Sequence, residues 1–499
     1  MGAWSSPERK AEAAASKRQP DRKMGSASQE CSKGKIARIV KVDWLDDTDT
    51  SSKAKKLLGA KGIQFVNLPR DDKFVDGKLV KNGDRLTNKP RFRVEFDQPG
   101  KHSFKVKLIA GGDNAAYSAT EKARNPNFTY DAGERTYTTD NDGTKVIDGD
   151  FQFTIAGNDR YKLEAIDELG NKVKSSDLVT RRLMYYVKLK MKGLRSVADN
   201  TSSFQSEFER HFIQFEKLPS ALMEHLPNVG TDTEPLLTAA REAYTSSKGP
   251  DKEGHVIAVI YTDHLAVKNP SQSVIRDGVN VGPRAPAIVI PLAGPGLTNP
   301  AVQRRYLWKD LVPGEGWFVS ATYSADAGGR DVVIPEPKCT ALPARSSSCT
   351  SVSVDVTDLP EGTGTITLVV NWVDRMRGGL SLGTGNAVCI CTRAWWMDKN
   401  TVEQNQVLVH EVGHQVGMVA NGTGWLPDRV STHYDSSRGH VGDHCHHGIP
   451  PGRARYDGAA DAMAARCVMY GATSSHIAFC SNCAPAVRKV DVSHAIPNF

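Results

Sequence analysis

The segment 401–418, which reads TVEQNQVLVHEVGHQVGM, constrains the fold more than any other part of the chain. It contains no proline, and Thr401 with Gln404 three residues later can form a capping box, so we expect a helix over 401–418. On that helix His410 and His414 are four residues apart and share one face, where both imidazoles can bind a single Zn²⁺ ion. The segment therefore predicts a helix that supplies two ligands of a metal site.

Glu411 follows the first of these histidines and completes the pattern H-E-x-x-H. In this position a glutamate acts as general base and proton shuttle for a water whose pKa the zinc ion lowers. The alternative is that the five-letter pattern occurs by chance. The residues around it decide between the two interpretations.

Histidine and cysteine are concentrated in the same region. Seven of the 14 histidines lie between His410 and His447, and four of the nine cysteines lie in the last 55 residues. Nine cysteines in 499 residues are too few for a disulfide framework. The clustering of imidazole and thiol groups indicates where the chemistry of the chain takes place.

Three further features follow the order found in the metzincin clan of zinc peptidases, which this region resembles. Gly417 extends the pattern to H-E-x-x-H-x-x-G, and the segment 467–470, CVMY, is similar to the Met-turn. The Gly-rich turn and strand over 377–392 are similar to the substrate-binding edge strand. The resemblance implies an α+β zincin domain with Met469 as an apolar floor beneath the metal. Tyr470 either turns its hydroxyl toward the oxyanion or packs as an ordinary aromatic residue.

Within the clan the chain resembles the archaemetzincin pattern, in which the third histidine is followed by a cysteine, then by C-x-M, then by C-x-x-C. The resemblance implies that His444 is the third ligand of a catalytic zinc ion. It also implies that four thiolates, a donor set that suits zinc, hold a second, structural ion. These are Cys445, Cys467, Cys480 and Cys483.

The chain departs from the family at the third ligand. The family places it three residues after the glycine, where this chain has Ala420, which cannot bind a metal. His444 lies 27 residues beyond Gly417, so a long loop must return to the helix. A zinc ion bound by Cys445 would reduce the entropy cost of that loop, which favours His444. The other candidates for the third ligand are His440, His433, His446 and Asp461.

The remaining cysteines have structural interpretations. Cys389 and Cys391 alternate on a predicted strand, point to one face and are expected to be buried thiols. Cys339 and Cys349 bracket a loop, and they could form a disulfide only in an oxidising compartment.

The rest of the chain divides into three predicted regions. Residues 1–34 are polar and basic and are predicted to be a flexible tail. Residues 35–196 show short period-2 runs separated by turns, which predict an antiparallel β-sandwich. The strand and turn over 161–171 resemble bacterial immunoglobulin-like modules, so an Ig-like adaptor domain is expected. The alternative is some other small β-domain. Residues 197–499 form the predicted metzincin-like α+β domain.

The predicted α+β domain begins with an amphipathic pattern and continues with apolar strand candidates. Four phenylalanines at spacings of four, four and three predict one apolar helical face: Phe204, Phe208, Phe212 and Phe215. The strand candidates lie within 255–261, 285–293, 317–323, 351–356 and 365–373.

Composition limits the class of protein. Apolar residues make up 39% of the chain and charged residues 24%, and no apolar run approaches the ~20 residues that span a bilayer. No transmembrane segment is therefore expected, and the first 23 residues contain no apolar core of a Sec-type signal peptide. The net charge of +7 is spread over the whole length, so no nucleic-acid partner is expected.

These features together predict a zinc-dependent endopeptidase that acts on a protein or peptide substrate. A cytosolic aminopeptidase is one alternative, and a non-catalytic binding or delivery protein with a vestigial zincin fold is another. The layout is similar to bacterial effectors delivered by contractile secretion systems such as type VI secretion. A toxin role would imply synthesis in the cytoplasm, a secretion-apparatus component bound through the N-terminal half, and an immunity protein.

Overall fold

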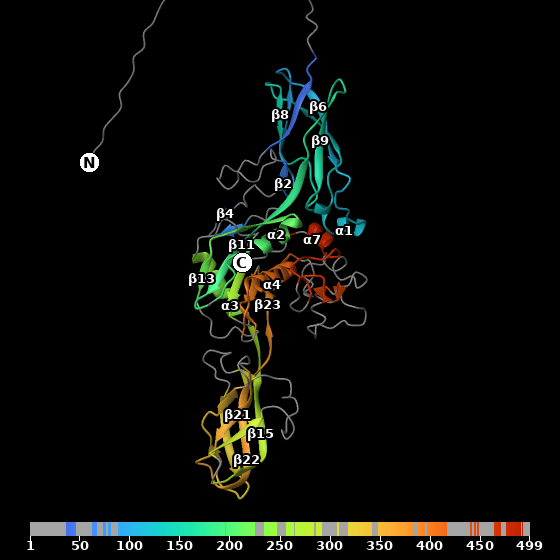
Figure 1. The fold of residues 1–499 in the computed structure, drawn as a ribbon. Helices are drawn as coiled ribbons and strands as arrows, with labels where there is room; N and C mark the ends of the chain where they lie inside the picture. The colour runs from blue at the N-terminus through green and yellow to red at the C-terminus, as the bar shows by residue number, and fades with distance from the viewer. Residues whose placement is uncertain are drawn as a thin grey trace, which may run out of the picture. The chain divides into compact units, whose positions relative to one another are not determined.

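The structure, a computed structural model, describes the chain in separate stretches. These are residues 36–45, 62–66, 73–75, 78–80, 88–194, 196–224, 234–246, 256–263, 265–283, 286–291, 307–308, 318–341, 348–382, 387–394, 397–416, 440–441, 444–445, 447–448, 464–470, 476–490 and 492. By its contacts the chain divides into two units, Met1–Ala37 and Arg38–Phe499. The predicted tail 1–34 lies outside the described residues. The described residues are mainly β-strands in several sheets, with few helices (Figure 1).

The N-terminal part contains two antiparallel sheets, as the period-2 runs predict. One consists of β1 (Ile39–Trp44), β5 (Phe92–Phe96) and β8 (Thr144–Ile147). The other contains β6 (Ser103–Ala110), β7 (Glu134–Thr138), β9 (Arg160–Asp167) and β10 (Lys172–Lys174). Aromatic side chains from the two sheets pack together. The ring centroids of Phe96 and Phe104 lie 5.7 Å apart, and those of Phe92 and Tyr137 lie 6.3 Å apart. Alternation in the sequence thus places the apolar face of each sheet against the other.

Strand β11 (Leu178–Met191) joins this antiparallel part to a parallel sheet. Its first residues pair antiparallel with β9 and parallel with β2 (Ile63–Phe65). Its remaining residues pair parallel with β12 (Ile213–Lys217), β13 (Ala221–Met223) and β14 (Val256–Thr262). The domain boundary after residue 196 stays a prediction. The strand on its N-terminal side, however, is hydrogen-bonded to strands on both sides of it.

The parallel sheet continues through β24 (Ala387–Cys391), which pairs parallel with β14, to the antiparallel β23 (Gly379–Leu382). All seven residues of β14 are buried, because helices cover both faces of the sheet. One apolar cluster joins one face to residues of α2 (Ser202–Arg210) and α4 (Thr401–Gln415). A second joins the opposite face to α3 (Glu234–Ser246). Within the described residues, β23 is the last strand of the sheet at this end.

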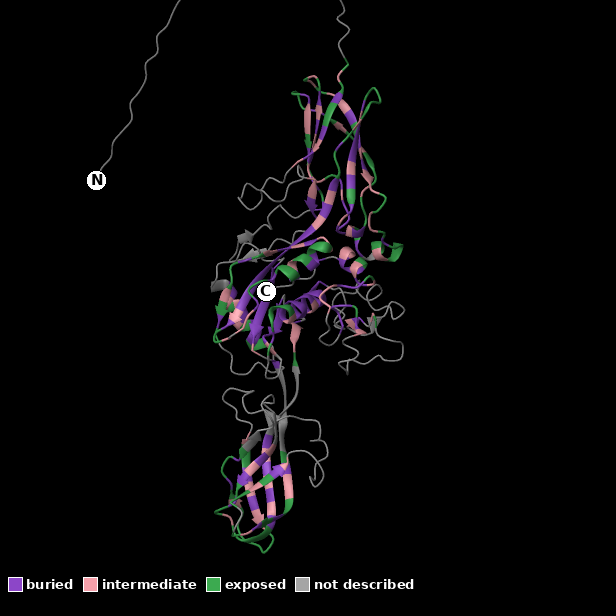
Figure 2. Cartoon of the chain, viewed as in Figure 1, coloured by how far each residue is buried: buried purple, intermediate pink, exposed green. Residues whose placement is uncertain are grey.

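Between β14 and β23 the chain forms a separate pair of four-stranded sheets, which was not predicted from the sequence. One sheet contains β15 (Leu265–Val281), β18 (Phe318–Ala325), β19 (Val332–Val333) and β22 (Gly362–Arg377). The other contains β16 (Ala287–Pro291), β17 (Leu307–Trp308), β20 (Lys338–Ala341) and β21 (Ser348–Asp355). Both share a core of their own, which includes Tyr323, Val352 and Leu368. Figure 2 shows buried positions along the strands of this unit. The predicted strands in 285–373 are therefore confirmed as strands, but they belong to this unit and not to the parallel sheet.

The phenylalanine pattern is only partly helical, which corrects the prediction of one helical face. Phe204 and Phe208 lie on α2, which ends at Arg210. Phe212 has a φ of 63°, a left-handed conformation that does not continue a right-handed helix. Phe215 lies on β12, and its ring still packs 4.8 Å from that of Phe204. Phenylalanines on a helix and on a strand can pack in the same core, so their spacing alone did not identify the end of the helix.

Helix α4 begins and ends close to the predicted limits. Its capping box consists of Asn400 and Glu403, one residue earlier than the predicted pair Thr401 and Gln404. Asparagine is a stronger N-cap than threonine, and Glu403 is positioned to bind the Asn400 N–H in return. The helix extends to Gln415, and Gly417 lies outside the described residues.

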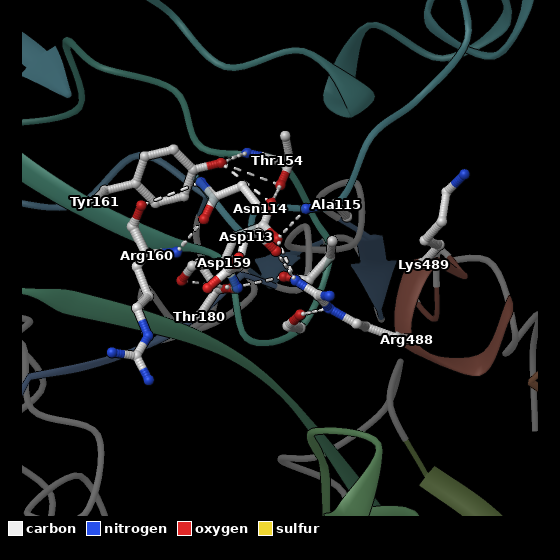
Figure 3. A network of polar contacts seen from close by, with 12 residues as sticks. Asp113, Asn114, Ala115, Thr154, Asp159, Arg160, Tyr161, Thr180, Arg488 and Lys489 are labelled. Atoms are coloured by element: carbon white, nitrogen blue, oxygen red, sulfur yellow. Dashed lines mark hydrogen bonds and ion pairs between the residues drawn. The ribbon is translucent and has the colours of Figure 1, made fainter. Parts of the chain in front are cut away.

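Helix α7 (Ala484–Lys489), near the end of the described chain, is bound to the N-terminal part (Figure 3). Arg488 donates to the carbonyls of Gly157 and Asp113 at 2.8 and 2.9 Å and to the Asp159 carboxylate at 3.1 Å. Asp159 is completely buried and also accepts from the Ala115 N–H at 2.7 Å. From β11, the buried Arg182 donates to the carbonyls of Val487 and Val490. These contacts fix the helix that directly follows the C-x-x-C segment.

Among the described residues, the helices are too short or too polar to cross a membrane.

Candidate metal centres

Three histidines converge at the end of α4. His410 and His414 lie on one face of the helix, and His444 comes from β28 (His444–Cys445). Their ring centroids are 4.8 to 5.2 Å apart, and one ring nitrogen from each lies within 4.8 Å of the others. His414 is buried, whereas the other two are partly exposed. The structure therefore brings together the three histidines that the sequence singled out, in a group that could hold a metal ion.

The orientation of the His410 ring suits metal binding. Its Nδ1 lies 2.7 Å from the Val468 carbonyl oxygen, so Nδ1 carries the proton and Nε2 is left with a lone pair. That Nε2 lies 3.2 Å from His414 Nε2. Two ligands at a Zn–N distance of about 2.05 Å from a tetrahedral ion would lie about 3.3 Å apart. The observed separation thus fits two imidazoles bound to one zinc ion.

Glu411 lies between the helix and the edge strand β23. Its side chain is 8% exposed, and burial raises its pKa to about 8, although a hydrogen bond from the Ser381 N–H opposes this shift. A Cβ atom at Gly379 would lie 2.9 Å from Glu411 Oε1, so the strand approaches the carboxylate closely. A carboxyl group with such a pKa can accept or release a proton near neutral pH.

Met469 lies directly beneath the helix. A Cβ atom at Gly413 would lie only 2.5 Å from Met469 Sδ, so the absence of a side chain at Gly413 allows this contact. Met469 is fully buried, as an apolar floor would be. Tyr470 is 1% exposed, and both of its predicted roles stay open.

The four cysteines form a second group, which is fully enclosed. Cys445 Sγ and Cys480 Sγ are 3.7 Å apart, as are Cys467 Sγ and Cys483 Sγ. All four side chains are buried, and the backbone N–H groups of His447 and Cys480 point at Cys445 Sγ and Cys467 Sγ from 3.5 Å. At a Zn–S distance of about 2.3 Å, tetrahedral thiolates lie about 3.8 Å apart. The sulfur spacing and the N–H donors therefore suit a tetrahedral ion bound by four thiolates.

The four-cysteine group also fixes segments that carry or orient members of the histidine group. Cys445 directly follows His444, and its N–H donates to the Met469 carbonyl at 2.8 Å. Cys467 precedes Val468, whose carbonyl orients His410. The buried Glu207 of α2 accepts from the Phe479 N–H at 2.9 Å, next to Cys480. A metal bound by the thiols would thus stabilise the segments that carry His444 and orient His410.

The structure does not describe the side chains of the other candidates for the third ligand. His433, His446 and Asp461 lie outside the described residues, as does Ala420. His440 lies on β27 (His440–Val441), where only the backbone is described.

Cys389 and Cys391 are buried thiols on β24, as predicted, and burial raises the pKa of Cys391 to about 12. Cys339 and Cys349 lie on the paired strands β20 and β21, but their side chains are not described, so the disulfide stays a prediction.

Sequence reasoning missed Gln415, Ser381 and the closeness of Gly379 to the helix. Val407, Glu411 and Gln415 are each four residues apart, and this stripe faces β23. The spacing was visible in the sequence. Its partner was not, because periodicity identifies a face of a helix and not the strand that packs on it.

Comparison with known proteins yields little. No family model matches the chain, and no curated protein does. A polysaccharide deacetylase from Bacillus cereus aligns with 34% of this chain and 55% of its own, at 11% identity and a TM-score of 0.12. A putative polysaccharide deacetylase from Bacillus anthracis aligns with the same shares, at 11% identity and a TM-score of 0.11.

A Paenibacillus cycloisomaltooligosaccharide glucanotransferase, complexed with cycloisomaltoheptaose, aligns with 65% of this chain and 78% of its own. Its identity is 7% and its TM-score 0.13. The alignments span about half the length of the two deacetylases. At such TM-scores they carry no argument about fold or function, so the functional conclusion depends on the site itself.

Proposed function

We propose that the chain is a zinc-dependent endopeptidase of metzincin type. The observation that carries this proposal is the convergence of His410, His414 and His444 beside the buried Glu411. A zinc site kept only for structure would have no need of a carboxylate at its side. When bound there, a zinc ion would supply Lewis-acid chemistry and lower the pKa of water.

The protein residues have separate roles in this proposal. The three imidazoles would hold the ion, and the Val468 carbonyl keeps the proton of His410 on Nδ1. Glu411 takes a proton from the attacking water and then gives it to the leaving amine. Burial raises the pKa of Glu411 to about 8, so its carboxyl group can accept a proton near neutral pH and release it again. The four thiols would hold a second, structural zinc ion.

The arrangement around the histidines also supports the proposed fold. Helix α4 packs against β23 and β24, and among the described residues β23 is the last strand at this end of the sheet. A strand in this position could serve as the substrate-binding edge strand that the resemblance implies. An extended peptide would add to β23 by main-chain hydrogen bonds. The Ig-like adaptor, the delivery role, the immunity protein and the secretion partner stay predictions.

Hydrolysis of casein with and without a zinc chelator tests the proposal against a binding protein. We expect cleavage into internal fragments, its loss on chelation and its recovery when zinc is added back. Release of single N-terminal residues without internal cleavage would favour the aminopeptidase alternative. Absence of any cleavage by the zinc-loaded protein would favour a binding or delivery protein.

A further inference from the structure

Helix α4 presents a stripe of three residues to the strand β23. Val407, Glu411 and Gln415 follow one another at single-turn spacing, and each approaches the strand at a different point. A Cβ atom at Gly379 would lie 2.4 Å from Val407 Cγ1 and 2.9 Å from Glu411 Oε1. Only glycine allows the helix to lie this close to the start of the strand.

Gln415 holds the other end of the strand. Its side-chain Nε2 donates to Ser381 Oγ at 2.6 Å and lies 3.1 Å from the Leu382 carbonyl oxygen and 3.3 Å from that of Ala387. Leu382 ends β23 and Ala387 begins β24, so one amide group binds both strands of the hairpin. Gln415 is 2% exposed, and a buried amide that makes such contacts is costly to remove.

Ser381 connects this amide to Glu411. Its backbone N–H donates to the Glu411 carboxylate, and its hydroxyl accepts from Gln415 one helical turn further on. The two bonds fix both the height of the strand along the helix and its distance from Glu411. A peptide added to β23 would take its register from the same strand.

We propose that Gln415 is a positioning residue that fixes the edge strand β23, and therefore a bound peptide, relative to Glu411. This inference rests on the proposed peptidase function. Displacement of about 1 Å between a substrate and a catalytic group can cost about 10²-fold in rate. The effect of Gln415 should therefore appear with substrates that pair along β23, and not with substrates too short to reach it.

The test compares Gln415→Leu with the wild type on an octapeptide and on a blocked dipeptide that share one scissile bond. Displacement of β23 and its bound peptide relative to Glu411 should lower kcat/KM for the octapeptide about 10-fold or more, mainly through kcat. The dipeptide should lose less than about two-fold, and the zinc content should not change. Gln406→Leu is the matched control, because Gln406 is a buried amide on the same helix that donates to the His476 carbonyl and not to β23.

Hydrogen exchange gives a readout that does not depend on peptidase activity. The amides of 379–382 should exchange faster in Gln415→Leu than in the wild type, and Gln406→Leu should leave them unchanged. If Gln415→Leu does not fold, Ser381→Ala removes one acceptor and should give the same pattern with a smaller loss.

Equal losses for both peptides, or unchanged exchange of 379–382, would overturn the positioning role. A wild type that cleaves neither peptide would overturn the peptidase proposal, while the exchange experiment would still decide whether Gln415 fixes the strand.

Discussion

His444 and Cys445 are neighbours in the chain, yet they belong to donor groups with opposite surroundings. The histidine group has two partly exposed members and a carboxylate beside it. The cysteine group is buried on all sides and receives backbone N–H groups at its sulfur atoms. Three ligands leave a position for a reacting molecule, whereas four thiolates close the coordination shell.

The difference assigns different tasks to the two groups. Exposure and a proton-transfer group suit a site where substrate enters. Complete burial and contacts to α2, to the Met469 carbonyl and to the chain leading into α7 suit a site that stabilises the fold. Substitutions in the two groups should therefore affect different measurable properties.

The largest effect is expected for Cys480→Ser. Loss of one thiolate should release the metal of the cysteine group, and the free energy of unfolding should fall by about 4 kcal/mol or more. Chemical denaturation with metal analysis of the purified protein measures both. Cys389→Ala is the control, since that thiol is buried but outside the group, and it should keep the full metal content. A Cys480→Ser protein of unchanged stability would show that the cysteine group is not structural.

His444→Ala should abolish proteolysis with little change in stability. The open group would lose one of its three ligands, so we expect one metal equivalent per chain to be lost while the cysteine-bound one remains. His447→Ala is the control, because its ring contacts Asn482 and not the histidine group. Unchanged metal content and activity in His444→Ala would transfer the third-ligand role to His440, His433 or Asp461.

A smaller effect is expected at the attachment of α7. Arg488→Gln leaves the buried Asp159 carboxylate without its cation and should lower the free energy of unfolding by about 3 kcal/mol. Lys105→Gln removes an exposed ion pair with Glu134 and should cost about 0.5 kcal/mol or less. Both variants should keep two metal equivalents. Equal stabilities of the two variants would show that the attachment contributes nothing specific.

The sequence predicted the local features of the site well. Helix α4 and the pairing of His410 with His414 follow from short spacings. The cysteine set was implied by the resemblance to the archaemetzincin pattern, and the structure brings its four members together. The choice of His444 depended on its neighbour Cys445, and the structure places the two as that reasoning requires.

Long-range features could not be predicted in the same way. Apolar runs identified the strands in 285–373 but not their partners, so the separate pair of sheets was missed. Strand β11 pairs antiparallel with β9 and parallel with β14. The sequence of a strand does not show which strands it pairs with, so this arrangement could not be predicted either. Gln415 belongs to no sequence motif. It was missed because its role depends on hydrogen bonds to Ser381 and Leu382, which lie on another element.

The substitution Glu411→Gln tests the central claim most directly, because the glutamine side chain can still accept the Ser381 N–H bond but cannot carry a proton from water to an amine. We expect an unchanged fold, two zinc equivalents per chain by elemental analysis, and casein hydrolysis reduced by at least ~10²-fold. Retention of most of the hydrolysis by a fully zinc-loaded Glu411→Gln protein would contradict the claim that Glu411 is the general base of a zinc peptidase.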